Sequence, residues 1–469
     1  MNKQYIFLAF TVLFLFACRS TNKAGNLNQQ MDEYLKGQAD YFRFNGNVLV
    51  AEKGKVIFQK SFGYADFDSK RLLNDSSVFE LASISKQFTA TAILLLKDKN
   101  KLNLTDSLTQ YFPELPYKGI TLYHMLTHTS GLPDYEEAMN NKWDRRKIAF
   151  NPDMIAFLAK EKPPLVFTPG TRWEYSNTAY ALLASIVEKI SGQSFSTYLT
   201  KNVFQPLGMS HSRIYNTRRS LKDTIPNYAY GYLYNDSLNK HEMPDSIPDL
   251  KFVIYLDGIQ GDGVVNSTTT DLLIWDRAVK NHSLLLEATQ KEMLKEQALA
   301  DTVNKVYYGF GVFLEKTEAG MVVSHSGGWP GYTTFLARNA DKDQTFILLS
   351  NNSSNSPALT KALQQLANGQ SVEIPYEHTE IALDTNQLQK FTGKYKIKSE
   401  FSIERTGNKI FRVFPNGQKT EIKPESPNKF FYADGTDRQI QFEMNDKQQV
   451  VKAWLFSYGI KTEIQKIKE

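Results

Sequence analysis

The chain has 469 residues, of which 41% are hydrophobic and 22% charged, so it can bury a large core and is not an intrinsically disordered protein. Its length predicts one large domain accompanied by a smaller one. A single cysteine excludes an internal disulfide and any cysteine-based metal cluster.

The first residues are typical of an export signal. An apolar run from Tyr5 to Phe16 follows Lys3 and is too short to span a membrane, so we predict a signal peptide over residues 1–17. The end of this run resembles the cleavage box of bacterial lipoproteins, which predicts a mature chain that begins at a lipidated Cys18; a buried cysteine is the alternative. Residues 18–28 are polar and suit a flexible tether. We therefore expect a membrane-anchored lipoprotein of the cell envelope, periplasmic or at the outer membrane, with no nucleic-acid partner despite its net charge of +5.

The next segments predict a sheet built from both ends of one domain, residues 29–370. A helical pattern over 27–44 precedes a β-hairpin at 46–51 and 56–58, and further strands are predicted near residues 310–350. Helices lie between these strands. The predicted fold class is therefore α/β (α+β), an antiparallel sheet flanked by helices with an additional helical region.

A buried helix is predicted to begin near Ser83, because the residues up to Leu96 are apolar on most sides and include no Gly or Pro. Lys86 follows Ser83 at i+3 on the same face, so its amine can form a hydrogen bond with the hydroxyl. A serine nucleophile that lacks a histidine needs such a base, and burial at the positive end of a helix helps an ammonium to release its proton. On this segment alone, a helix-capping serine is the alternative.

Two histidines, His124 and His128, stand four residues apart. This spacing occurs in zinc-binding helices, but the metalloprotease pattern needs Glu directly after the first histidine and Met125 stands there. We therefore predict structural packing for both histidines and no metal site.

Two further groups of residues stand where secondary structure begins or ends. Tyr175 and Asn177 flank the start of an apolar helix, where a phenol can relay a proton and a carboxamide can hold an amide; ordinary loop residues are the alternative. A strand over 321–324 leads into His325, Gly327 and Gly328. Small residues there let a substrate backbone approach and offer N–H groups to an oxyanion, unless they form only a glycine-rich turn.

The C-terminal region is predicted to be a second domain. The apolar pattern lapses over a linker, residues 371–387, and short strands follow from residue 388 to 469. Asn416-Gly417 and Asp434-Gly435 are typical of hairpin turns, so this domain is predicted to be a small antiparallel barrel or sandwich.

Taken together, the order Ser83-x-x-Lys86, Tyr175-x-Asn177 and His325-x-Gly327 resembles the serine β-lactamase and penicillin-binding protein superfamily, nearest to its class C β-lactamase branch with D,D-carboxypeptidases and esterases. Residues 126–132 are also similar to a sequence common in that branch. The resemblance covers roughly residues 30–355 and implies a β-lactamase/transpeptidase-like fold. The C-terminal domain is similar to a lipocalin-like domain that some members carry.

The resemblance implies a role for each residue. Ser83 attacks a carbonyl, Lys86 takes its proton, and Tyr175 carries a proton to the leaving group. The acyl-enzyme is then hydrolysed without a cofactor or metal. The backbone N–H groups of Ser83 and Gly328 form the oxyanion hole. The residues implied to bind the substrate are Asn177, which holds its amide, and His325, Gly327 and Gly328.

His325 departs from the family pattern, because β-lactamases and carboxypeptidases usually have Lys at this position. A histidine with a pKa of ~6.5 is mostly neutral at pH 7 and, if it faced the substrate, would gain charge toward pH 6. We therefore predict a serine hydrolase of amides or esters rather than a dedicated β-lactamase, with D-amino-acid peptides, including those derived from peptidoglycan, and β-lactams as candidate substrates. The alternative is an envelope sensor or penicillin-binding protein that is acylated without turnover.

Overall fold

The computed structural model describes residues 26–140, 142–214 and 225–467. These residues form two compact units, Asn45–Pro357 and a second unit that joins the described residues up to Phe44 with those from Ala358 onward. The predicted signal peptide and Cys18 lie outside the described residues. A helix over 26–42 begins inside the range predicted as tether. Within the described ranges, no helix is both long and apolar enough to cross a membrane.

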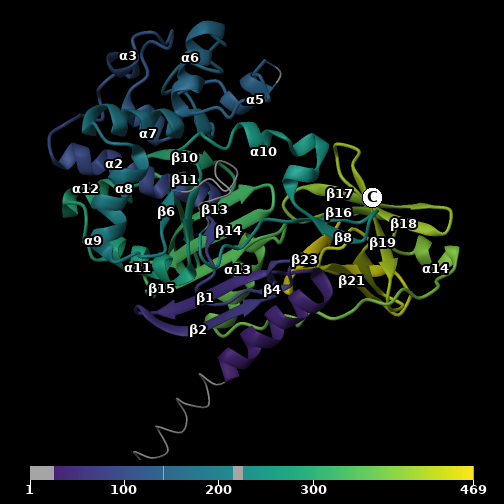
Figure 1. Cartoon of the computed structure of the whole chain (residues 1–469). Helices are drawn as coiled ribbons and strands as arrows, with labels where there is room; N and C mark the ends of the chain where they lie inside the picture. Colours follow the sequence, from purple (N-terminus) through teal and green to yellow (C-terminus); the bar gives the residue numbers. More distant parts are fainter. Residues whose placement is uncertain (1–25, 141, 215–224, 468–469) are drawn as a thin grey trace, which may run out of the picture. The chain divides into compact units, whose positions relative to one another are not determined.

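The larger unit contains an antiparallel sheet of eight strands in the order β10-β11-β12-β13-β14-β15-β1-β2. β1 pairs with β15 along its whole length, with Val48 opposite Leu348, so the N-terminal hairpin joins the last strands of the unit as predicted (Figure 1). β1 and β15 are buried along nearly all of their residues, which suits their apolar sequences. The strands are β1 (Gly46–Glu52), β2 (Lys55–Phe62), β10 (Ala298–Asp301), β11 (Val306–Tyr308), β12 (Phe313–Thr317), β13 (Gly320–Trp329), β14 (Tyr332–Asn339) and β15 (Gln344–Ser350).

Helices form the other layer of this unit, and α2 (Lys86–Asp98) is its most buried member. Apolar residues cover nearly every side of α2, so it has to be enclosed, and α7 (Asn177–Ser191) packs against it. The Ser176 hydroxyl caps α7 by accepting from the N–H of Ala179 at 3.2 Å, and Gly192 ends the helix in a left-handed conformation. The other helices are α3 (Leu108–Tyr111), α4 (Leu122–Leu126), α5 (Tyr135–Asn140), α6 (Asn151–Glu161), α8 (Phe195–Leu199), α9 (Gln205–Leu207), α10 (Phe252–Tyr255), α11 (Thr269–Lys280) and α12 (Glu287–Met293).

A three-stranded sheet, β5-β9-β6, brings together segments that are far apart in the sequence. Its strands are β5 (Phe79–Glu80), β6 (Arg213–Ile214) and β9 (Val265–Ser267). The N–H of Leu81, directly after β5, donates to the carbonyl of Val265 at 2.8 Å. This pairing holds the start of the Ser83 turn beside the loop that precedes β9.

The second unit contains a closed barrel of eight antiparallel strands, which confirms the predicted C-terminal barrel. β16 pairs with β23, which closes the barrel. Gly417 and Gly435 have positive φ values and lie in two of its turns. Helix 26–42 belongs to this unit, since the Tyr34 hydroxyl donates to the Tyr458 carbonyl at 3.0 Å. The strands are β16 (Gly393–Lys396), β17 (Glu400–Thr406), β18 (Lys409–Val413), β19 (Lys419–Pro424), β20 (Lys429–Tyr432), β21 (Arg438–Met444), β22 (Val450–Ser457) and β23 (Ile460–Lys466); the remaining helices are α13 (Ser356–Ala367) and α14 (Thr385–Gln389).

Candidate active site

Ser83 lies in a single 3₁₀ turn, Ala82–Ser85, that continues directly into α2. The ammonium nitrogen Nζ of Lys86 lies 3.1 Å from Ser83 Oγ, as the i+3 spacing predicted. Ser83 is partly exposed, whereas Lys86 is fully buried. Ser85 rather than Ser83 occupies the N-cap position of α2, so the alternative of a helix-capping Ser83 is wrong.

The backbone around Ser83 is held in conformations that residues with a side chain seldom adopt. Ala82, next to Ser83, has a φ of +47°, and Val264, in the loop before β9, has a φ of +67°. A positive φ is unfavourable for any residue with a Cβ atom and more so for a β-branched one. The hydrogen bonds on both sides hold this geometry: Val265 N–H donates to Ser85 Oγ at 3.0 Å.

Lys86 is fixed by three acceptors. Besides Ser83 Oγ, its Nζ donates to Asn177 Oδ1 at 2.8 Å and to the backbone carbonyl of Asp262 at 2.7 Å. The other end of the Asn177 amide, Nδ2, donates to Glu136 Oε1 at 2.9 Å. Asn177 therefore links a partly buried carboxyl group to the amine beside the candidate nucleophile.

Tyr175 lies next to Lys86 through its ring. Lys86 Nζ is 4.8 Å from the centre of that ring, close enough for a cation–π contact. The Tyr175 hydroxyl is buried and has no hydrogen-bond partner among the described residues. The structure thus brings Tyr175, Asn177, Lys86 and Ser83 together, without a hydrogen bond from the phenol to Ser83.

His325 is close to these residues, but its side chain is turned into the protein. It is 1% exposed, its Nδ1 donates to the Ser326 carbonyl at 2.6 Å, and its Nε2 accepts from the Tyr308 hydroxyl at 3.2 Å. Burial lowers the pKa of His325 to about 3, and the charge of Lys86 acts in the same direction. The gain of charge toward pH 6 was expected only if His325 faced the substrate, and this condition is not met, because the imidazole is buried and does not line the pocket beside Ser83.

The two glycines of the third motif have different surroundings. A Cβ atom on Gly327 would lie 2.1 Å from the Leu81 carbonyl oxygen and 2.2 Å from Thr334 Oγ1, so only glycine fits where β13 crosses the chain before Ser83. A Cβ atom on Gly328 would meet nothing within 4 Å. Gly328 lines the pocket that contains Ser83, whereas Gly327 supports the segment behind it.

The two histidines near residue 126 make separate structural hydrogen bonds. His124 Nδ1 accepts from the Thr121 N–H at 3.3 Å. His128 is fully buried, its Nδ1 accepts from the Ser176 N–H at 3.0 Å, and its ring centre lies 4.3 Å from that of Tyr175. Burial lowers the pKa of His128 well below its usual value, and the positive charge of Lys86 lowers it further. His128 therefore positions the segment that carries Tyr175, as a neutral group.

A pocket with a cavity volume of about 120 Å³ opens beside Ser83. Its lining combines carboxyl groups with apolar side chains. Burial, followed by repulsion from Asp262 and then Asp134, raises the pKa of Glu136 to about 7. Burial also raises the pKa of Asp262, whose carboxylate accepts from the Tyr135 hydroxyl at 2.8 Å. The residues on the pocket wall include Glu80, Ala82, Ser83, Tyr135, Glu136, Asn177, Leu256, Asp257, Ile259, Asp262, Gly263, Val264, Gly328 and Trp329.

Glu136 and Asp262 were not predicted from the sequence. Asp262 lies between two glycines, and Gly261 has a φ of +110° with the position of its missing Cβ only 2.5 Å from the Tyr180 carbonyl oxygen. A glycine pair around a carboxylate was therefore a local signal of a constrained loop. Glu136 carries no comparable signal, because its place in the pocket depends on contacts with residues more than forty positions away.

Comparisons with known proteins agree with this fold. Residues 28–370 match the family model described as Beta-lactamase. A penicillin-binding protein of Bacillus subtilis is 37% identical over 415 residues, which are 87% of this chain and 92% of that protein. A penicillin-binding protein structure from Bacillus halodurans matches with a TM-score of 0.63 and 26% identity, over 71% of this chain and 98% of that one. The D-amino acid amidase from Ochrobactrum anthropi is similar in fold, with a TM-score of 0.60 and 24% identity over 73% and 96% of the two chains.

Proposed function

We propose, because this chain belongs to the β-lactamase family of serine hydrolases, that it cleaves an amide or ester bond through an acyl-enzyme on Ser83. The observation that carries the proposal is the 3.1 Å contact between Lys86 Nζ and Ser83 Oγ at a pocket wall. Lys86 in its neutral form takes the hydroxyl proton while Oγ bonds to the substrate carbonyl carbon. The leaving amine or alcohol departs with a proton, and water then cleaves the acyl ester and restores Ser83.

The remaining roles follow from where each group lies. Tyr175, in contact with Lys86, carries the proton to the leaving group. The backbone N–H groups of Ser83 and Gly328 stabilise the oxyanion, and a donor of this kind contributes about 3 kcal/mol in comparable sites. Asn177 has one amide hydrogen left after its bond to Glu136 and offers it to the substrate.

The buried side chain of His325 revises the part assigned to the third motif. It makes no contribution to the pocket wall, which Gly328 reaches instead. We therefore propose that the substrate meets β13 through the Gly328 backbone, and that His325 supports Tyr308 from behind.

The substrate proposed is a D-amino-acid derivative, a peptidoglycan-derived peptide or a β-lactam. Relatives named penicillin-binding proteins and the fold shared with a D-amino acid amidase favour these classes over other acyl compounds. The finer activities, carboxypeptidase, peptidase and esterase, are separated by a panel of a chromogenic cephalosporin, a D-alanyl peptide and a short-chain aryl ester. A protein that is acylated without turnover is the second candidate, favoured by the name of the 37% identical relative.

Replacing Ser83 with Ala tests the nucleophile. The variant is expected to lose both the covalent adduct with a fluorescent penicillin and the hydrolysis of every substrate in the panel. Among the described residues of the site, Ser83 carries the one hydroxyl group that forms a hydrogen bond with Lys86. Adduct mass and turnover are measured in parallel. Stoichiometric adduct without turnover in the native protein would favour the penicillin-binding candidate, and near-normal hydrolysis by Ser83→Ala would falsify the proposal.

We also propose that the protein is exported and anchored at the envelope through lipid on Cys18, with the membrane and a small-molecule or peptide substrate as its partners. The apolar run from Tyr5 to Phe16, just before Cys18, supports this. Mass spectrometry of the membrane fraction is expected to find an acylated Cys18 as the first residue. An intact Met1 or an unmodified Cys18 would contradict the proposal.

A further inference from the structure

A small cavity lies between α2, α11 and the strands β13 and β14. Its volume is about 20 Å³, which is room for one water-sized group. None of its described lining residues belongs to the pocket beside Ser83. Valine, leucine and tryptophan side chains form the apolar part of its wall, and the polar part is formed by Gln87, Asp276, Ser324 and Arg338. The polar residues therefore decide what this cavity can hold.

Arg338 brings a buried positive charge to this wall. It is 6% exposed, and its Nε and Nη1 atoms have no hydrogen-bond partner among the described residues. The carboxylate oxygen Asp276 Oδ1 lies 3.7 Å from Nε, which is close enough for an ion pair but too far for a hydrogen bond. Burial lowers the pKa of Arg338, although the charge of Asp276 opposes this. Because a guanidinium keeps its proton even so, its N–H groups are left to an acceptor that the protein does not supply.

The ion pairs around Arg338 contain more cations than carboxylates. Arg277 forms ion pairs with both Asp276 and Asp343, and Lys280 pairs with Asp343. These two carboxylates are also the ones whose charges act on the pKa of Arg338. Among the described residues of this network, three positive groups therefore share two negative ones. Asp276 is already paired with Arg277, so a single negative charge in the cavity would balance the network rather than meet a free carboxylate.

Gln87 adds an uncharged hydrogen-bond donor to the same wall. It is 5% exposed, and its Oε1 accepts from Trp275 Nε1 at 3.0 Å. An indole nitrogen can only donate, so this bond fixes which end of the amide is the oxygen. The Nε2 hydrogens of Gln87 have no acceptor among the described residues. Gln87 and Arg338 thus both offer N–H groups to an occupant that accepts hydrogen bonds.

We infer that the cavity binds one monatomic anion, chloride, on the guanidinium of Arg338, with Gln87 as a second donor. A water molecule between Arg338 and Asp276 would leave the excess charge in place, whereas chloride balances it. The cavity is too small for sulfate, phosphate or a carboxylate. This anion site goes beyond the proposed hydrolysis and does not depend on it. Bound chloride joins α2, which begins at Lys86, to α11 and β14, so it supports the helix that carries the candidate base.

Bromide tests the site directly, because it resembles chloride in size and charge and its position can be found by anomalous X-ray scattering. Crystals of the full chain soaked in sodium bromide are expected to show an anomalous peak in the cavity, next to Nε or Nη1 of Arg338. Crystals of Arg338→Met should lack this peak. A cavity of the native protein that holds only water in the presence of bromide would overturn the inference.

Thermal unfolding tests the same site in solution. The melting temperature of the full chain is measured in sodium chloride and in sodium gluconate at equal ionic strength, since gluconate is too large for the cavity and general screening is then matched. We expect the native protein to gain about 2–4 °C in chloride, in a saturable manner, once chloride exceeds its dissociation constant about tenfold. Arg338→Met replaces the charge with an apolar side chain and should lose this gain. Arg146→Met, at an exposed arginine, is the matched control and should keep it.

The two measurements together leave the chloride site either supported or rejected. An equal gain in chloride for the native protein and for Arg338→Met would place the ion elsewhere on the molecule and reject the inference. The absence of any gain in the native protein would reject it as well. If Arg338→Met does not fold, the bromide peak in crystals of the native protein decides the question alone.

Discussion

The two sides of Lys86 are lined by different kinds of side chain. Behind it lie aromatic rings and two histidines, His128 and His325, whose pKa values burial lowers so that both are neutral. In front of it lie carboxyl groups such as Glu136 and Asp262, whose pKa values burial raises. Burial disfavours charge on both sides. The difference shows that the rear side is a neutral support for the catalytic groups, whereas the front side carries acidic groups that line the pocket beside Ser83.

The largest expected effect comes from placing a charge on the rear side. His325→Lys puts an ammonium among Tyr308, Phe313 and Tyr175, close to Lys86, and an unpaired buried charge costs several kcal/mol. We expect a large fall in melting temperature or a failure to fold, rather than improved binding of carboxylate substrates. His282→Lys, at an exposed site, is the control. A folded His325→Lys protein of native stability would show that the rear side is not a low-dielectric support.

Alanine substitutions at the two glycines of β13 test where the buried rear side of the site ends and the open pocket begins. Gly327→Ala forces a methyl group against the Leu81 carbonyl, so we expect a loss of about 2–4 kcal/mol of stability and a displaced Ser83 turn with lower activity. Gly328→Ala has open space for its methyl group, so its stability should change by less than about 1 kcal/mol. Denaturant unfolding and ester hydrolysis measure both. Equal stability of the two variants would mean that β13 can move away from Leu81.

Removing a charge from the front side should stabilise the protein. The folded pKa of Glu136, about 7, lies above that of an unfolded glutamate, so the folded state binds the proton more tightly and stability falls as pH rises from about 4.5 to 7. Glu136→Gln cannot ionise, so it should gain up to about 3 kcal/mol over the native protein above pH 7 and nothing below pH 4.5. Melting curves across this range, with Glu137→Gln as control, measure the gain. A gain independent of pH would contradict the titration.

The smallest expected effect is the absence of a histidine titration on the rear side. Because burial holds the pKa of His325 near 3 and lowers that of His128, neither gains a proton between pH 5 and 8. NMR signals of both imidazoles should keep their shifts over this range. A midpoint near pH 6 for His325 would restore the idea that it faces the substrate.

The two sides of Lys86 also differ in how well the sequence predicted their residues. Ser83 and Lys86 were predicted as a pair because i+3 contacts on a helix are local. His325 was predicted to follow a strand over 321–324, but β13 runs from Gly320 to Trp329 and His325 lies in its middle, with a buried side chain that does not line the pocket. Along β13, His325 and Gly327 are buried while Ser326 and Gly328 are exposed, so the alternation of a strand already separates His325 from Gly328.

The sequence could not predict the acidic residues of the pocket wall, because they show no periodic pattern and belong to no motif. Glu136 and Asp262 meet only after α5 and the loop before β9 fold against α7, and their raised pKa values depend on that assembly. The eight-stranded sheet and the barrel were predictable, since apolar alternation and Asn-Gly or Asp-Gly turns are local features. The sequence therefore predicted the candidate catalytic groups and the scaffold, but not the acidic residues of the pocket wall.

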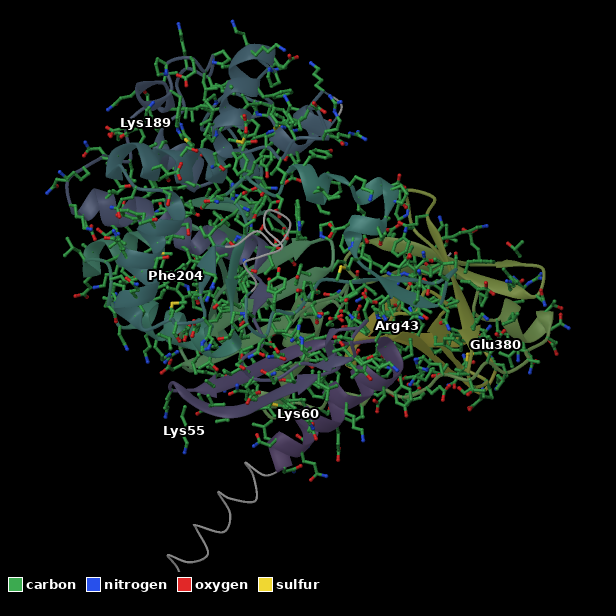
Figure 2. The ribbon with its side chains drawn as sticks, viewed as in Figure 1. Arg43, Lys55, Lys60, Lys189, Phe204 and Glu380 are labelled. Carbon is green, nitrogen blue, oxygen red and sulfur yellow. The ribbon has the colours of Figure 1, made fainter. Side chains whose placement is uncertain are left out.

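The strand order of the larger sheet affects how the protein avoids aggregation at high concentration. β2 is the last strand in that order and pairs with β1, so its outer backbone groups could template another strand. Lys55 and Lys60 are both exposed on this strand, as Figure 2 shows, and bringing two copies edge to edge would crowd their ammonium groups together. The barrel needs no such protection, because closure leaves it without an edge. Resistance to edge-to-edge aggregation is thus achieved by charge in one unit and by topology in the other.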